Sequence, residues 1–231
     1  LNPENTLTAF LTSIQLGGHV VEFDIRLTRD ERLVVYHDEK IDRTTNASGV
    51  LRSFTLEELQ ALDAAFHYTT DDQPFPHRGK NVRIPTLRLV LETLWSRAEE
   101  LLETRNLVNV NIEIKDEDNR ASDLLVEELS RYGIDRVKDN VAVVSRFCSV
   151  INHFRTTVKH KIPTAACEGE ATKFMFRTWY LDRVRPLLSL IPFVDAMLSN
   201  TFYKRPEYSV LQIPMYSGGM SLITDQIVKA A

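Results

Sequence analysis

The sequence predicts an α/β fold in which a parallel sheet closes into a (β/α)8 barrel of the TIM type. Short apolar runs alternate with amphipathic segments, the pattern of parallel strands joined by crossover helices. The chain has 231 residues, a length at which α/β barrels form one domain. Polar residues that carry chemistry stand at the ends of several apolar runs, where barrel enzymes place their active sites.

The composition is that of an ordinary globular protein and argues against nucleic-acid binding and against a membrane span. Hydrophobic residues make up 43% and charged residues 26% of the chain, enough for a sizeable core. The net charge is -4 with Lys and Arg scattered, so we expect no nucleic-acid partner. No run of about 18 uncharged apolar residues indicates a membrane span. The two cysteines, Cys148 and Cys167, are expected as free thiols, with a bridge or a reactive site as the alternative.

The first part of the chain is predicted to form a helix and two strands. Apolar residues recur at helical spacing after the turn residues Pro3-Glu4-Asn5-Thr6, and capping is the preferred role of Glu4 and Asn5 over contact with a site. A polar turn separates the two strand-like runs that follow. These elements are expected at residues 2–16 (helix), 20–25 and 33–36 (strands).

A polar insertion precedes the second part of the predicted barrel. The stretch 64–83 is polar and rich in Asp, Pro and Gly, and insertions of that length are usually functional or disordered. Residues 39–83 are expected to form an inserted lobe. Within and after it, helices are expected at 55–62, 84–104, 122–132, 149–157 and from 224, and strands at 108–114, 141–144, 163–167 and 209–215.

Segment 174–198 is apolar but interrupted by charged residues. We expect a connecting helix packed on the barrel. The alternative is a helix at a membrane surface, because basic residues alternate there with aromatic and leucine side chains. No signal peptide is visible, and a cytoplasmic or peripheral membrane location is favoured while the compartment stays open.

Three carboxylates are predicted to converge. Residues i and i+2 of a strand point to the same side, so Glu22 shares a side with Asp24, and Glu113 with Lys115. Unpaired buried charges are costly. We therefore predict that Glu22, Asp24 and Glu113 bind a divalent metal, Mg²⁺ or Ca²⁺, since hard cations prefer oxygen ligands. The alternative is a carboxylate cluster paired with Lys or Arg and no metal.

Two further residues are predicted to act beside this cluster. His37 is the candidate acid–base group, because imidazole titrates near neutral pH, and a structural histidine is the alternative. Lys115 is the candidate phosphate contact that neutralises charge on phosphoryl oxygens. Its alternative role is a salt bridge to a metal ligand, and the two roles are compatible.

A series of motifs resembles the glycerophosphodiester phosphodiesterase family. The resemblance is strong up to about residue 116 and weaker beyond, where it rests mainly on 211–214. The motifs are Pro3-Glu4-Asn5-Thr6, Glu22-Phe23-Asp24, His37-Asp38, Arg43-Thr44-Thr45, Ile84-Pro85-Thr86-Leu87 and Asn111-Ile112-Glu113-Ile114-Lys115.

The resemblance implies metal-dependent cleavage of a glycerophosphodiester to glycerol 3-phosphate and an alcohol. It places Glu22, Asp24 and Glu113 on the metal and Lys115 on the phosphate, and His37 protonates the leaving oxygen. Residues Arg43, Thr44 and Thr45 could shape the pocket rim, and Glu168 could reach the glycerol hydroxyls or lie at the surface. The inserted lobe would cover the pocket mouth.

The family pattern also has a His-Arg-Gly strand upstream and a further strand downstream of the matched motifs. Residues 1–231 are therefore expected as a single barrel domain that is incomplete at both ends, with its terminal strands missing. Two alternatives to the diesterase are kept. One is a lysophospholipase D acting on a lysophospholipid, for which segment 174–198 would supply an apolar docking surface. The other is a non-catalytic barrel that binds a ligand.

Overall fold

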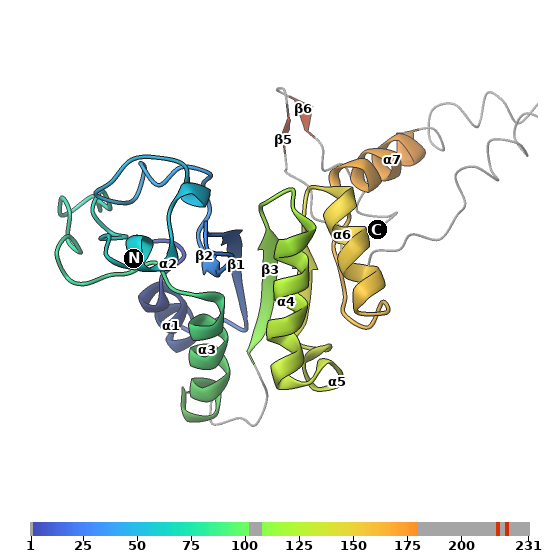
Figure 1. Ribbon diagram of the computed structural model, residues 1–231, viewed down its shortest axis with the longest axis horizontal. Coiled ribbons are helices and arrows are strands. Elements are labelled where there is room, and N and C mark those ends of the chain that lie inside the picture. The colour runs from blue at the N-terminus through green and yellow to red at the C-terminus, as the bar shows by residue number, and fades with distance from the viewer. Residues whose placement is uncertain (1, 102–107, 180–215, 218–219, 222–231) are drawn as a thin grey trace, which may run out of the picture.

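The computed structural model describes residues 2–101, 108–179, 216–217 and 220–221, and shows a mixed α/β architecture (Figure 1). The helices are α1 (Leu7–Gln15), α2 (Leu56–Gln60), α3 (Leu87–Leu101), α4 (Asn119–Tyr132), α5 (Ile134–Val137), α6 (Cys148–Thr157) and α7 (Glu168–Trp179), with a 3-10 turn η1 (Leu51–Ser53). The strands are β1 (Val20–Leu27), β2 (Leu33–Val35), β3 (Asn109–Ile114), β4 (Val141–Val144), β5 (Tyr216–Ser217) and β6 (Met220–Ser221).

The main sheet has the strand order β2-β1-β3-β4. Strands β1, β3 and β4 are parallel, as predicted, and their register places Asp24 beside Glu113 and Glu113 beside Val144. Strand β2 instead pairs antiparallel with β1, so the expectation of an all-parallel sheet is wrong here. A parallel pair needs a crossover of about a dozen residues or more. The short turn after Leu27 therefore permits only a hairpin.

The strand predicted at 163–167 is reduced to a single parallel bridge between Val143 and Thr164. Pro163 accepts a hydrogen bond from Val143 N through its carbonyl, but it has no N–H to donate and so cannot extend a regular ladder. The strand predicted at 209–215, the helix from 224 and segment 174–198 beyond residue 179 lie outside the described residues. The closed barrel remains a prediction.

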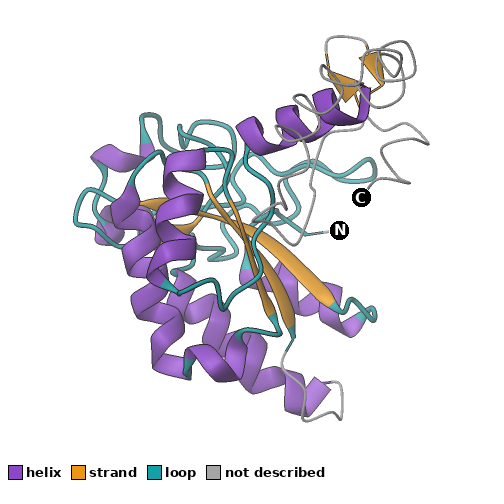
Figure 2. Cartoon of the chain, turned by 90° about the vertical axis from the view of Figure 1, so that its right-hand side faces the viewer, coloured by secondary structure: helices purple, strands orange, loops and turns teal. Residues whose placement is uncertain are grey.

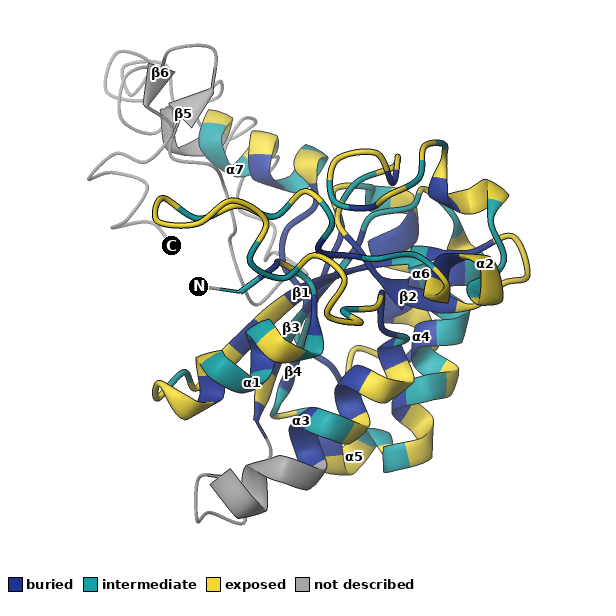
Figure 3. Ribbon diagram, turned by 90° about the vertical axis from the view of Figure 1, so that its left-hand side faces the viewer, coloured by how far each residue is buried: buried dark blue, intermediate teal, exposed yellow. Residues whose placement is uncertain are grey.

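The core lies between the sheet and the helices beside it (Figures 2 and 3). Phe10 and Ile14 of α1 pack with Phe23 and Ile25 of β1, and all four side chains are buried. Burying such a side chain contributes about 1.5–3 kcal/mol, so this inward face holds α1 against β1. No helix of the described residues is long and apolar enough to cross a membrane.

The inserted segment 39–83 is folded around a small core of its own. Its buried side chains pack together with two residues of the β2 segment and with Ile84. Helix α2 within it is started by a capping box between Thr55 and Glu58. The segment lies at the end of the molecule where β1 and β3 terminate, visible at the upper left of Figure 1. That end is where the predicted chemistry stands.

Cys148 and Cys167 form a disulfide, so the expectation of free thiols is wrong. Their Cα atoms lie 5.1 Å apart, within the usual range for a bridge. The backbone bonds between Val143 and the segment that begins at Pro163 bring the second cysteine beside the start of α6. The separation of 19 residues in the sequence carries no signal of this tertiary contact.

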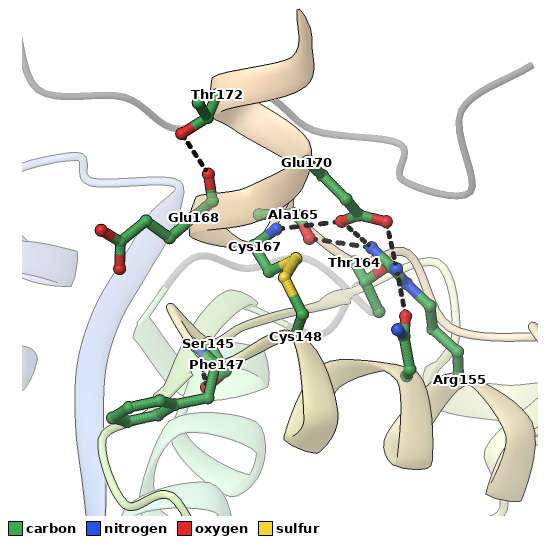
Figure 4. Close-up of a disulfide and its surroundings, with 11 residues drawn as sticks. Ser145, Phe147, Cys148, Arg155, Thr164, Ala165, Cys167, Glu168, Glu170 and Thr172 are labelled. Atoms are coloured by element: carbon green, nitrogen blue, oxygen red, sulfur yellow. Dashed lines mark hydrogen bonds and ion pairs between the residues drawn. A yellow bond between two sulfur atoms is a disulfide. The ribbon is translucent and has the colours of Figure 1, made fainter. Parts of the chain in front are cut away.

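A buried ion pair joins α6, which carries Arg155, to α7, which carries Glu170. The Arg155 side chain is 1% exposed and its Nη1 lies 2.7 Å from Glu170 Oε1. Arg155 also donates to Thr164 and to the carbonyl of Ala165, and Glu170 accepts from the backbone N–H of Cys167. Figure 4 shows this network beside the disulfide, with the Glu168 carboxylate pointing away from it.

Candidate functional site

The three predicted carboxylates meet on one side of the sheet. One oxygen each of Glu22, Asp24 and Glu113 lie within 4.8 Å of one another. The parallel register sets Asp24 beside Glu113, and Glu22 stands two residues earlier on the same side of β1. The sequence predicts Glu22 and Asp24 at the end of a strand, but both lie within β1. The strand continues to Leu27, and its last residues pair with β2.

The electrostatics of this cluster favour a cation. Burial raises the pKa of Glu22, and the negative charges of Asp24 and Glu113 raise it further. The donors are oxygen atoms only, which fits a hard divalent cation such as Mg²⁺ or Ca²⁺. The residues therefore suit the predicted metal, and all three would hold it.

Lys115 lies against the same carboxylates. Its Nζ is 3.1 Å from Asp24 Oδ1 and 2.9 Å from Glu113 Oε2. Burial alone lowers the pKa of Lys115, but the hydrogen bonds and charges of Glu113 and Asp24 outweigh it, so the pKa is raised. The two carboxylates thus favour the charged form of Lys115. The salt-bridge role is present in the geometry, and it is compatible with the predicted phosphate contact.

His37 lines the same groove as Glu22 and Asp24, a hollow of about 380 Å³ beside α1. The hairpin brings it there, because Tyr36 N donates to the carbonyl of Asp24 over 2.9 Å. Arg26 donates from Nε to the carbonyl of His37 and from Nη1 to Asp116, which follows β3. The backbone of His37 is therefore tied to both β1 and the end of β3.

The imidazole orientation of His37 is set by Asp38. Nδ1 of His37 lies 2.6 Å from Asp38 Oδ1, and Asp38 Oδ2 accepts from Arg43 Nε over 2.6 Å. The hydrogen bond from Arg43 lowers the pKa of Asp38 to about 2. An ionised carboxylate only accepts hydrogen bonds, so Nδ1 carries the proton and Nε2 is left for acid–base work. The sequence prediction did not single out Asp38, although its place directly after the candidate histidine was a signal.

Asn5 contacts a predicted metal ligand, so the preferred capping role is wrong for it. Its Nδ2 donates to Asp24 Oδ2 over 2.9 Å, and its Oδ1 accepts from Asp24 N over 3.3 Å. Thr6 caps α1 instead, accepting from Ala9 N. Glu4 does not cap either, because its carboxylate pairs with Arg43. The turn has the composition of a helix cap, so the sequence did not indicate the contacts of Asn5 with Asp24 and of Glu4 with Arg43.

The other candidate side chains divide between structural and open roles. Arg43 is held by Glu4 and Asp38, Thr44 hydrogen bonds to the Tyr36 hydroxyl, and Thr45 is buried. A role for these three in shaping the rim stays a prediction. Glu168 begins α7 and is exposed. Its contact with a ligand is likewise a prediction.

Comparison with known proteins assigns the chain to a family. The profile of the glycerophosphoryl diester phosphodiesterase family matches residues 1–231. A glycerophosphodiester phosphodiesterase of Caldanaerobacter subterraneus is 42% identical over 113 residues, covering 49% of this chain and 40% of that protein. One from Bacillus altitudinis is 34% identical over 162 residues, covering 69% of this chain and 57% of that protein. The matched part of the chain thus spans only 40% to 57% of the length of these relatives.

Solved structures show the same fold. A glycerophosphodiester phosphodiesterase from Agrobacterium tumefaciens superposes with a TM-score of 0.58 at 24% identity, covering 75% of this chain and 64% of that chain. A phosphodiesterase from Oleispira antarctica, solved in complex with the product sn-glycerol-3-phosphate, superposes with a TM-score of 0.51 at 23% identity, covering 71% and 60%. The profile match over residues 1–231 shows that the chain belongs to the glycerophosphoryl diester phosphodiesterase family.

Proposed function

We propose that the chain carries the site of a metal-dependent enzyme that cleaves glycerophosphodiesters to glycerol 3-phosphate and an alcohol. The observation that carries the proposal is the cluster of Glu22, Asp24 and Glu113 with Lys115 against it. His37 lines the groove that Glu22 and Asp24 also line. The names of the relatives and the sn-glycerol-3-phosphate held by the Oleispira antarctica enzyme support the same substrate class.

The residues divide the chemistry between them. Glu22, Asp24 and Glu113 would hold a divalent cation, which when bound would supply positive charge to polarise a phosphoryl oxygen. Lys115 adds a second positive charge against the phosphoryl oxygens, where negative charge develops in the transition state. In the overall hydrolysis the P–O bond to the leaving alcohol breaks, water supplies the oxygen of the new P–O bond, and the proton that the water loses passes to solvent. His37 begins as the imidazolium and gives its Nε2 proton to the leaving alcohol oxygen, while ionised Asp38 stabilises the charged ring through Nδ1.

The closed (β/α)8 barrel and the lobe at 39–83 belong to the same proposal. The parallel strands β1, β3 and β4 support a barrel, and the folded core of the inserted segment supports a lobe. A lobe at the end of the sheet where β1 and β3 terminate would cover the pocket mouth and take part in recognising the glycerol. Contact with a membrane through 174–198 concerns residues that, beyond 179, lie outside the described part.

The disulfide bears on the compartment, which the sequence left open. Disulfides persist in oxidising compartments and are rare in the cytosol. The bond between Cys148 and Cys167 therefore favours an oxidising compartment over the cytoplasmic location expected from the sequence.

The test is release of glycerol 3-phosphate from glycerophosphocholine with Mg²⁺, Ca²⁺ or chelator. We expect metal-dependent release that His37→Ala abolishes. The matched control is His153→Ala, since His153 also pairs with an aspartate, Asp123 at 2.7 Å, but lies on α6. Choline released only from a lysophospholipid would indicate the lysophospholipase D instead. Metal binding without turnover of either substrate would indicate the binding-only barrel.

A further inference from the structure

Two adjacent residues before α1 reach the two halves of the site. Asn5 hydrogen bonds to the predicted metal ligand Asp24. Glu4 pairs with Arg43, which in turn holds Asp38 beside His37.

Asn5 and Asp24 each donate a hydrogen bond to the other, and Asp24 is buried. Asp24 is 4% exposed, and its two carboxylate oxygens are divided between Asn5 and Lys115. The backbone N–H of Asp24 donates to the Asn5 amide oxygen, so the amide is fixed relative to the strand. Two hydrogen bonds in opposite directions therefore set the direction in which the Asp24 carboxylate points.

The backbone of Asn5 is adapted to this contact. Its φ is 54°, in the left-handed region that few side chains adopt without cost and that asparagine tolerates best after glycine. Since Thr6 supplies the helix cap, the cap does not explain this conformation. The turn is instead shaped so that the amide faces Asp24.

The contact of Glu4 acts through a chain of charges. Arg43 donates from Nη1 to Glu4 Oε2 over 2.9 Å and from Nε to Asp38 Oδ2 over 2.6 Å. The side chains of Glu4 and Arg43 are about half exposed, 48% and 51%, and exposed pairs add little to stability. The Glu4 pair instead fixes the position of the Arg43 guanidinium group. That group positions Asp38, and Asp38 orients the His37 ring.

We propose that Glu4 and Asn5 are positioning residues that jointly orient the acid–base group and a metal ligand of the site. Asn5 orients the Asp24 carboxylate, and Glu4 orients the His37 ring through Arg43 and Asp38. Because the two residues are adjacent, one turn of chain contacts both halves of the site. Both roles rest on the proposed function, that of Asn5 on its metal site and that of Glu4 on its turnover. If the wild type binds no Ca²⁺, the proposed metal site itself fails, whereas an unchanged affinity in the Asn5 variant refutes only the role of Asn5.

The first experiment tests Asn5 by measuring the affinity of the protein for Ca²⁺, without substrate, by calorimetry. Asn5→Gly keeps the left-handed backbone and removes the amide, and Asn81→Gly is the matched control, with φ 60° in the inserted segment. Removing a group that orients a metal ligand costs about 10- to 100-fold in affinity. We expect that loss for Asn5→Gly with an unchanged melting temperature in chelator. A loss no larger than that of Asn81→Gly overturns this half of the proposal.

The second experiment tests Glu4 by two measurements, kcat at saturating metal and the tautomer of His37 by ¹⁵N NMR. The His37 signals are identified by their loss in His37→Ala. Glu4→Gln is expected to lower kcat about 10-fold or more and to reduce the Nδ1–H form, with Ca²⁺ affinity unchanged. Glu31→Gln is the control, since its pair with Arg120 has similar exposure of 54% and 41%. If the wild type shows no diesterase activity, the proposed function fails while the tautomer still decides the role of Glu4. An unchanged tautomer overturns that role.

Discussion

The disulfide between Cys148 and Cys167 makes a quantitative prediction about stability. It closes a loop with a sequence separation of 19, and removing the restraint restores the entropy of that loop to the unfolded chain. For a loop of this length the chain-entropy relation corresponds to about 3 kcal/mol at 25 °C. Reduction should therefore lower the free energy of unfolding by about that amount, a large part of the 5–15 kcal/mol typical of a folded protein.

The measurement is urea unfolding of the protein with and without a thiol-free reductant, followed by circular dichroism. With a denaturant slope of about 3 kcal/mol/M, the midpoint should fall by about 1 M. The double variant Cys148→Ala/Cys167→Ala should start from the lower midpoint and show no further response to reductant. Equal midpoints for the oxidised and reduced wild type, or two titratable thiols in the native protein before reduction, would refute the reasoning.

Three further perturbations follow from the ion pairs. Glu170→Ala leaves Arg155 buried without its carboxylate, which costs about 3–5 kcal/mol, and urea unfolding should show a loss larger than that for Asp135→Ala, whose pair with Lys161 is exposed. Lys115→Met removes the cation from the phosphate position, and kcat for glycerophosphocholine should fall about 100-fold or more, whereas an unchanged kcat would leave Lys115 only its structural role. The pKa of Asp38 is lowered from 3.8 to about 2, so its ionised form stabilises the fold above pH 3.8 and this contribution is lost as the pH falls toward 2. Asp38→Asn should therefore flatten the dependence of melting temperature on pH in that interval, and an unaltered slope would contradict the assigned pKa shift.

Much of the candidate site could be predicted because strand geometry is local. Alternation along a strand places Glu22 with Asp24, and Glu113 with Lys115, whatever the rest of the fold does. The meeting of the two pairs required only that β1 and β3 be parallel neighbours, which their separation by a helix indicates. The motif series then led to the family that the profile match shows.

The second layer of the site could not be predicted in the same way. Asn5 and Glu4 stand in a turn whose composition suits a helix cap, and a local reading assigns them to it. Their actual partners are Asp24 and Arg43, which lie far along the chain and reach them only when α1, the hairpin and the inserted segment are assembled. The hairpin itself was within reach of the sequence, since the turn after Leu27 is too short for a crossover.

The sequence by itself determined the α/β class, most helix and strand positions, the sides on which the carboxylates stand and the family to which the chain belongs. These depend on periodicity and on local spacing, which a chain carries before it folds. Only the tertiary structure decided that Cys148 pairs with Cys167, that Arg155 is buried against Glu170, and that Asn5 faces Asp24. Each of these contacts joins segments whose distance in space is set by packing of the whole core, and no local pattern encodes that distance.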